Sequence, residues 1–130
     1  MSNEITIKDK DLLTTITQTG LDDIIKPLVT EIHLFDTYVA GTSYLEEPSI
    51  LDEIKLGDKL TLTREANKFD DNAILIKAQD GRKLGYIPEK DNLIFSRLMD
   101  AGKLLMAKIS DHDIKGTFHK IKIGIYLVDY

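Results

Sequence analysis

Residues 60–88 read LTLTREANKFDDNAILIKAQDGRKLGYIP, and this stretch decides the fold. Residues 59–64 alternate polar with apolar side chains, which is typical of a half-buried strand. Residues 73–77 form an apolar run that ends in a charge, and residues 83–87 can return beside it. The Asp80-Gly81 pair between them predicts a tight hairpin turn, because glycine accepts the positive φ that such turns require.

The polar loop that joins the first two of these strands contains an aromatic residue, Phe69. Its neighbours in the sequence carry hydrogen-bonding side chains: Arg64, Asn67, Asp70 and Asn72. Binding residues concentrate on loops that rigid strands hold in place. A stacking ring beside donors and acceptors is also what readers of single-stranded nucleic acid use. The loop is therefore a candidate nucleic-acid site.

Structural roles are open for the same loop residues. Phe69 either stacks on a ligand or plugs the core, with Tyr44 as its neighbour. Asp70 and Asn72 either meet a ligand or cap the loop by bonding its own backbone, as such residues commonly do.

Two further residues have equally plain structural alternatives. Arg64 can pair with Glu65 or Asp58 at the surface, a contact worth about 0–1 kcal/mol. Tyr86 can face either the solvent or the wall of a barrel, and the sequence leaves its side open.

The rest of the chain predicts further strands and one clear helix. Residues 31–40 form one long strand, bulged at its middle, and residues 103–110 and 118–128 return to strand pattern. The helix runs over residues 89–101 and ends at Gly102. Its predicted buried face consists of Ile94, Leu98 and Ala101, bordered by Leu93.

These elements predict a mainly β protein with some α structure. Six or seven strands with one embedded helix form a small, OB-like antiparallel β-barrel over residues 30–130. Residues 1–29 differ in pattern, and we expect a short helical extension packed on the barrel.

Composition excludes several classes of protein. The 130 residues are 42% apolar and 30% charged and include no cysteine, which excludes disulfides and thiolate zinc sites. We find no signal peptide or bilayer-spanning run and expect a cytoplasmic protein. The net charge of −5 disfavours a duplex-DNA binder. Residues 103–122 nevertheless hold five lysines against two aspartates, so a locally basic face remains open.

The acidic and histidine residues do not form a recognisable metal site. Asp111-His112-Asp113, even with His33 and His119, matches no known ligand spacing, and we expect a solvated loop there. Asp70 and Asp71 would need a third carboxylate to bind a catalytic metal ion, and no pattern in the sequence places one beside them. We therefore predict no catalysis, no metal, no cofactor and no small-molecule substrate.

The order and spacing of many short motifs resemble the HIRAN domain over about residues 30–109. The matching segments are Tyr38-Val39-Ala40-Gly41, Tyr44, Gly57-Asp58, Leu62, Arg64-Glu65, Asn67, Phe69-Asp70, Asn72-Ala73-Ile74, Gly81, Leu84-Gly85-Tyr86-Ile87-Pro88 and Leu98-Met99-Asp100-Ala101-Gly102. Each segment is weak alone, but together they are specific. The resemblance implies an OB-like barrel with helices at its side. It also matches the small stand-alone bacterial members in size.

The resemblance implies that the chain captures the 3′ end of single-stranded DNA, as characterised eukaryotic members do. Tyr44 and Phe69 would stack on terminal bases, and Asp70 would accept a hydrogen bond from the 3′-hydroxyl. Asn67 would contact the terminal nucleotide, and Tyr86 would lie beside the backbone. The chain would then recruit or assist a separate replication or repair enzyme, an unidentified protein partner.

Three departures from the family pattern weaken the DNA-binding face. Leu45 replaces a second aromatic residue, and Ser43 stands where the DNA-binding members carry arginine. Glu89 takes the place of a base after the proline, which leaves Lys90 as the nearest cation. The alternative is therefore a protein-interaction domain that kept the barrel and lost the DNA-end site. A positive rim around Phe69 would favour DNA, whereas a negative or apolar rim would favour a protein partner.

Overall fold

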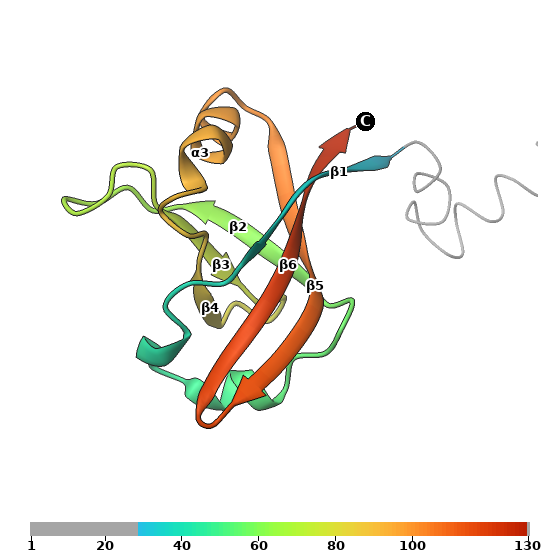
Figure 1. The fold of residues 1–130 in the computed structure, drawn as a ribbon. Helices are drawn as coiled ribbons and strands as arrows, with labels where there is room; N and C mark the ends of the chain where they lie inside the picture. Colours follow the sequence, from blue (N-terminus) through green and yellow to red (C-terminus); the bar gives the residue numbers. More distant parts are fainter. Residues whose placement is uncertain (1–28, 130) are drawn as a thin grey trace, which may run out of the picture. The chain divides into compact units, whose positions relative to one another are not determined.

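A six-stranded sheet forms the framework of the computed structural model, which describes residues 29–129. The strands follow the order β1-β6-β5-β2-β3-β4, and every pairing from β6 to β4 is antiparallel. They are β1 (Thr30–Tyr38), β2 (Lys59–Arg64), β3 (Ile74–Lys77), β4 (Lys83–Tyr86), β5 (Leu104–Lys115) and β6 (Phe118–Asp129). The sheet curls into a half-barrel, which confirms the predicted OB-like fold (Figure 1).

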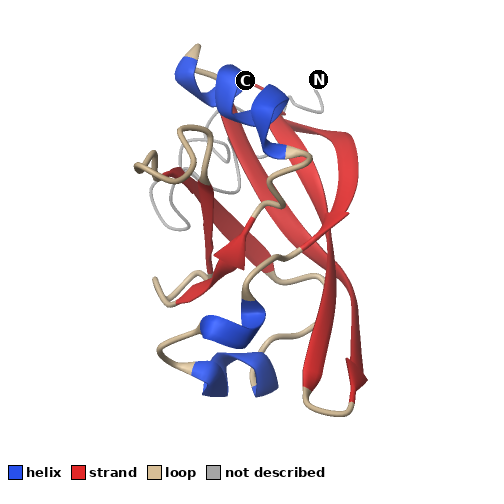
Figure 2. Cartoon of the chain, turned by 60° about the vertical axis from the view of Figure 1, so that its left-hand side comes forward, coloured by secondary structure: helices blue, strands red, loops and turns tan. Residues whose placement is uncertain are grey.

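The helical elements lie at the two ends of the sheet. The α-helix α3 (Asn92–Asp100) lies at one end, and the short 3-10 helices η2 (Thr42–Tyr44) and η3 (Pro48–Asp52) lie at the other (Figure 2). None of the helices in the described part of the chain is long and apolar enough to cross a membrane. The helical extension predicted before residue 30 lies outside the described residues.

The two edges of the sheet meet where β1 ends and β4 ends. Ala40 and Tyr86 exchange backbone hydrogen bonds of 2.8 and 2.9 Å. The approach requires Gly85, because a Cβ atom there would lie 2.4 Å from the carbonyl oxygen of Ala40. This contact closes one end of the half-barrel, and Tyr86 lies beside the loop that joins β2 to β3.

The core is built from the alternating side chains that the sequence predicts. In β6, Ile121, Ile123 and Ile125 are fully buried, and the intervening Lys122 is only half-buried. Burying an isoleucine contributes about 1.5–3 kcal/mol, so this strand is a main source of stability. The predicted hairpin is also confirmed, since Gly81 has a φ of 92° and Ala78 bonds to Arg82 across the turn.

The prediction of a solvated loop at residues 111–113 is wrong. β5 continues through a register shift after Ile109, and Asp111, His112 and Asp113 pair with β6. Two of their partners are lysines, so opposite charges face each other across the strands and favour pairing. Residues 29–129 hold no group of three or more side chains placed to bind a metal ion together.

The predicted buried face of the helix is wrong in part: Leu98 is half-buried and packs against the core, but Ala101 is exposed. Ile94 is 67% exposed and Leu93 is 48% exposed, whereas Phe95, Asn92 and Ser96 are buried. The inward face can include the polar Asn92 and Ser96 because the neighbouring loop supplies hydrogen-bond partners for them. The end of the helix is as predicted, since Gly102 has a φ of 92° and its N–H donates to the carbonyl of the third residue before it.

Candidate nucleic-acid site

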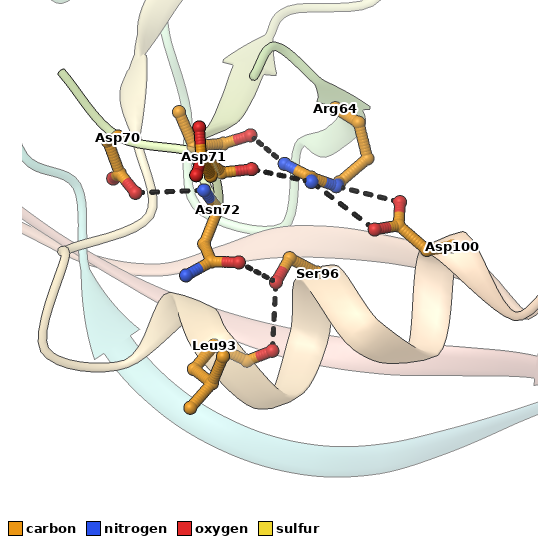
Figure 3. A network of polar contacts seen from close by, with 8 residues as sticks. Arg64, Asp70, Asp71, Asn72, Leu93, Ser96 and Asp100 are labelled. Atoms are coloured by element: carbon orange, nitrogen blue, oxygen red, sulfur yellow. Dashed lines mark hydrogen bonds and ion pairs between the residues drawn. The ribbon is translucent and has the colours of Figure 1, made fainter. Parts of the chain in front are cut away.

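Arg64, at the end of β2, anchors the loop that carries Phe69. Its guanidinium donates to the backbone carbonyls of Ala73 and Asp71, each at 2.7 Å (Figure 3). It also bonds the carboxylate of Asp100 in α3, with 2.9 Å between Nε and Oδ1. The sequence offered Glu65 or Asp58 as the surface partner of Arg64, and this prediction is wrong. The carboxylate that pairs with Arg64 belongs to Asp100, which lies 36 residues away in the chain. The hydrogen bond from Arg64 lowers the pKa of Asp100 below its ordinary value.

Asn67 fixes the tip of the loop. Its Oδ1 accepts hydrogen bonds from the backbone N–H groups of Phe69 and Asp70, at 2.8 and 3.0 Å. Its Nδ2 donates to the carbonyl oxygen of Glu65 at 3.1 Å. One side chain thus satisfies three backbone groups that strand pairing does not reach.

Asp70 and Asn72 attach the other side of the loop to α3. Asp70 Oδ1 accepts from the backbone N–H of Asn72 at 2.9 Å, the expected capping bond. Asp70 Oδ2 accepts from Nδ2 of the buried Asn92 at 2.8 Å. Ser96 lies 3.3 Å from Oδ1 of Asn72 (Figure 3). Asp70 therefore caps the loop, which was its structural alternative. Its carboxylate still has lone pairs that these two hydrogen bonds do not use.

Phe69 does not plug the core. Its side chain is 84% exposed, although the loop beneath it is held by the bonds described above. Tyr44, at the end of η2, is 87% exposed. An exposed aromatic ring on a constrained loop loses little conformational freedom when a flat group stacks on it. Both rings are thus available for stacking.

A pocket of about 310 Å³ lies beside Phe69. It is lined by Ala40, Asn67, Phe69, Asp70, Ala73, Tyr86, Ile87 and Glu89. Four of the seven predicted site residues meet there. Tyr44 and Arg64 are not part of the lining, and Lys90 lies in a different pocket, where its Nζ is 3.0 Å from Asp91.

Tyr86 is half-buried and belongs to a polar cluster at the edge of this pocket. Its hydroxyl donates to the carboxylate of Glu65 and accepts from Nζ of Lys83, 3.1 Å away. The ammonium of Lys83 also lies 4.4 Å from the centroid of the Tyr86 ring. Glu65 and Lys83 were not predicted as site residues, because only the pairing of β3 with β4 brings this tyrosine back to the end of β2.

The charges around the pocket have both signs. Asp70 and Glu89 line it, whereas Lys68 lies over Phe69 and Lys83 lies over Tyr86. The rim is therefore neither uniformly positive nor uniformly negative. Its charge alone does not decide between nucleic-acid binding and protein binding.

Comparison with known proteins identifies the family of this chain. The HIRAN domain matches residues 32–127. The fold matches a crystal structure of a protein from Lactobacillus plantarum with a TM-score of 0.72 and 26% identity, over 78% of this chain and 99% of that one. It also matches the HIRAN domain of human HLTF with a TM-score of 0.61 and 15% identity, over 75% of this chain and 78% of that one. No curated protein sequence gave a significant match. The chain therefore belongs to the HIRAN domain family, a family of nucleic-acid-binding modules.

Proposed function

We propose that this protein binds single-stranded DNA by a free 3′ end, in the pocket beside Phe69, and catalyses no reaction itself. The observation that supports the proposal is the 84% exposure of Phe69 on a loop that Asn67 and Arg64 hold in place. Stacking of a base on such a ring contributes about 1–3 kcal/mol and requires no particular sequence.

Six of the seven predicted site residues, all but Lys90, have a role in this proposal. Phe69 and Tyr44 stack on the last bases, and the free lone pairs of Asp70 accept a hydrogen bond from the 3′-hydroxyl. Tyr86 supplies a polar contact beside the backbone. Asn67 and Arg64 act chiefly by fixing the loop, since their polar atoms already bond to it.

The two carboxylates of the pocket provide a physical basis for end selection. A 3′-phosphate would bring negative charge next to Asp70 and Glu89, which both line the pocket. Two like charges about 4 Å apart repel by about 4 kcal/mol at an effective dielectric constant of about 20. A 3′-hydroxyl carries no charge and can donate to the carboxylate instead. The pocket therefore favours an unphosphorylated end.

The biological role in this proposal is to bring a separate replication or repair enzyme to a DNA end in the cytoplasm. A binding module without catalysis needs such a partner to have an effect. Recruitment is tested separately from DNA binding, by asking whether a partner captured from the source cells is still captured by the Phe69→Ala variant.

Fluorescence anisotropy with a short oligodeoxynucleotide labelled at its 5′ end tests the proposal. The oligonucleotide carries either a 3′-hydroxyl or a 3′-phosphate, and binding is measured at low and physiological salt. We expect Phe69→Ala to weaken binding of the 3′-hydroxyl form about 5- to 150-fold, the equivalent of one stacked base. Phe118→Ala is the matched control, because Phe118 is 48% exposed and is not part of the pocket lining. Equal binding of the two ends, or equal loss in both variants, would contradict end capture.

A second candidate function is a protein-interaction domain, and one surface favours it. A pocket of about 260 Å³ between β1 and α3 is lined by Phe35, Lys90, Asp91, Leu93, Ile94 and Phe95. Several of these apolar side chains are exposed, as protein-binding surfaces often are. If the oligonucleotide does not bind even at low salt, this candidate becomes the better one.

A further inference from the structure

The four cations near the candidate site divide into two kinds. Arg64 and Lys90 form ion pairs, with Asp100 at 2.9 Å and with Asp91 at 3.0 Å. Lys68 and Lys83 have no carboxylate oxygen within 4.0 Å among the residues that the structure describes. An ion-paired cation must give up or share its partner to bind a phosphate, whereas an unpaired one does not. Lys68 and Lys83 are thus the better phosphate ligands.

Each of these two lysines also lies next to an aromatic ring of the pocket lining. Nζ of Lys68 is 5.1 Å from the centroid of Phe69, and Nζ of Lys83 is 4.4 Å from the centroid of Tyr86. Both rings line the pocket. Each attraction between ammonium and ring holds a long, flexible side chain close to the place where bases would stack. Positive charge is therefore placed beside two aromatic rings of a pocket whose lining includes two carboxylates.

We propose that Lys68 and Lys83 bind the phosphates that link the stacked nucleotides, and that Lys90 does not. This inference rests on the proposed function and deepens it, because it names the groups that bind the sugar-phosphate backbone of the DNA. An ammonium has three donors, and Lys83 uses one of them on the Tyr86 hydroxyl, which leaves two for a phosphate. The two ammonium groups also offset the repulsion between the DNA phosphates and the carboxylate of Glu89.

Binding of a 3′-hydroxyl oligodeoxythymidylate at several sodium chloride concentrations tests the inference. The logarithm of the affinity falls with the logarithm of the salt concentration by about 0.7 for each phosphate contact of a single strand. We expect Lys68→Gln and Lys83→Gln each to make this slope shallower by about 0.7, and the double variant by about 1.4. Lys83→Arg keeps the charge and should retain the wild-type slope.

Lys120→Gln is the matched control. Nζ of Lys120 lies 4.7 Å from the centroid of Tyr38, so it has the same arrangement of ammonium over ring, but neither residue lines the pocket. The substitution also changes the net charge by the same amount, so it measures the contribution of overall charge. We expect it to leave the slope unchanged.

The possible results separate this inference from the proposed function. If the wild type binds, Phe69→Ala weakens binding and the two lysine variants keep the wild-type slope, the lysine assignment is wrong and end binding stands. A slope that changes in Lys90→Gln instead would assign the phosphate contact to Lys90 and overturn the inference. If the wild type shows no binding at low salt, both proposals fail together. Thermal unfolding of each variant shows whether the fold is retained.

Discussion

Gly85→Ala tests how the closure of the half-barrel determines both stability and the binding pocket. The added Cβ would lie 2.4 Å from the carbonyl oxygen of Ala40 and 2.5 Å from Cγ1 of Val39. The first of these atoms belongs to the backbone, so rotation of a side chain cannot relieve the clash. The strands must therefore move apart at this point, and Tyr86 must move with them.

The cost can be estimated from the contacts that separation would remove. Ala40 and Tyr86 exchange two backbone hydrogen bonds, each worth about 0.5–1.5 kcal/mol net. Overpacking a well-packed region adds about 1–3 kcal/mol. We expect Gly85→Ala to lower the free energy of unfolding by about 2–6 kcal/mol in total. Because Ala40 and Tyr86 both line the pocket, oligonucleotide affinity should fall as well.

Urea unfolding followed by circular dichroism measures the change in stability, with Gly57→Ala as the control. Gly57 has a φ of 88°, but an added Cβ there would meet no atom within 4 Å. Its substitution should cost only about 1–2 kcal/mol, for the left-handed backbone alone. If the two variants lose equal stability, or if Gly85→Ala binds the oligonucleotide as the wild type does, the reasoning about strand closure is wrong.

Three further predictions concern the charges and the loop. Glu89→Lys should raise oligonucleotide affinity at low salt and steepen the salt slope by about 0.7, since it replaces a repulsion in the pocket with a phosphate contact; an unchanged titration would contradict this. Asn92→Ala should destabilise the protein by about 1–3 kcal/mol in urea unfolding, because Asp70 loses a buried partner, and a change below 0.5 kcal/mol, roughly the size of a neutral surface substitution, would refute it. The pKa of Asp100, followed by NMR, should lie below its ordinary value and return toward it in Arg64→Gln. Since that pKa is lower in the folded state, the stabilisation is present above the unfolded pKa and is lost as pH falls through the folded value, so the Arg64→Gln variant should be less sensitive to acid over that range.

Much of the candidate site could be predicted from local sequence. The placement of Phe69 in a polar loop and the turn at Gly81 depend on neighbours within a few residues, whereas the exposure of that ring and the capping bond of Asp70 stayed open between two alternatives. Local patterns are sufficient for such features because the interacting groups are connected by a short, stiff stretch of chain. The core residues of β6 were predictable for a related reason, since alternation along a strand assigns each side chain to a face.

The sequence by itself thus determined the strands, the hairpin turn, the aromatic loop and the family. Only the tertiary structure decided which residues surround that loop: Asp100 pairs with Arg64, Asn92 with Asp70, and Glu65 and Lys83 with Tyr86. It also turned Asn92, Phe95 and Ser96 of α3 inward and extended β5 through residues 111–113. The physical reason is that these partners are far apart in the sequence. Their pairing depends on strand register and on hydrogen bonds that compensate buried polar groups, and neither leaves a local pattern.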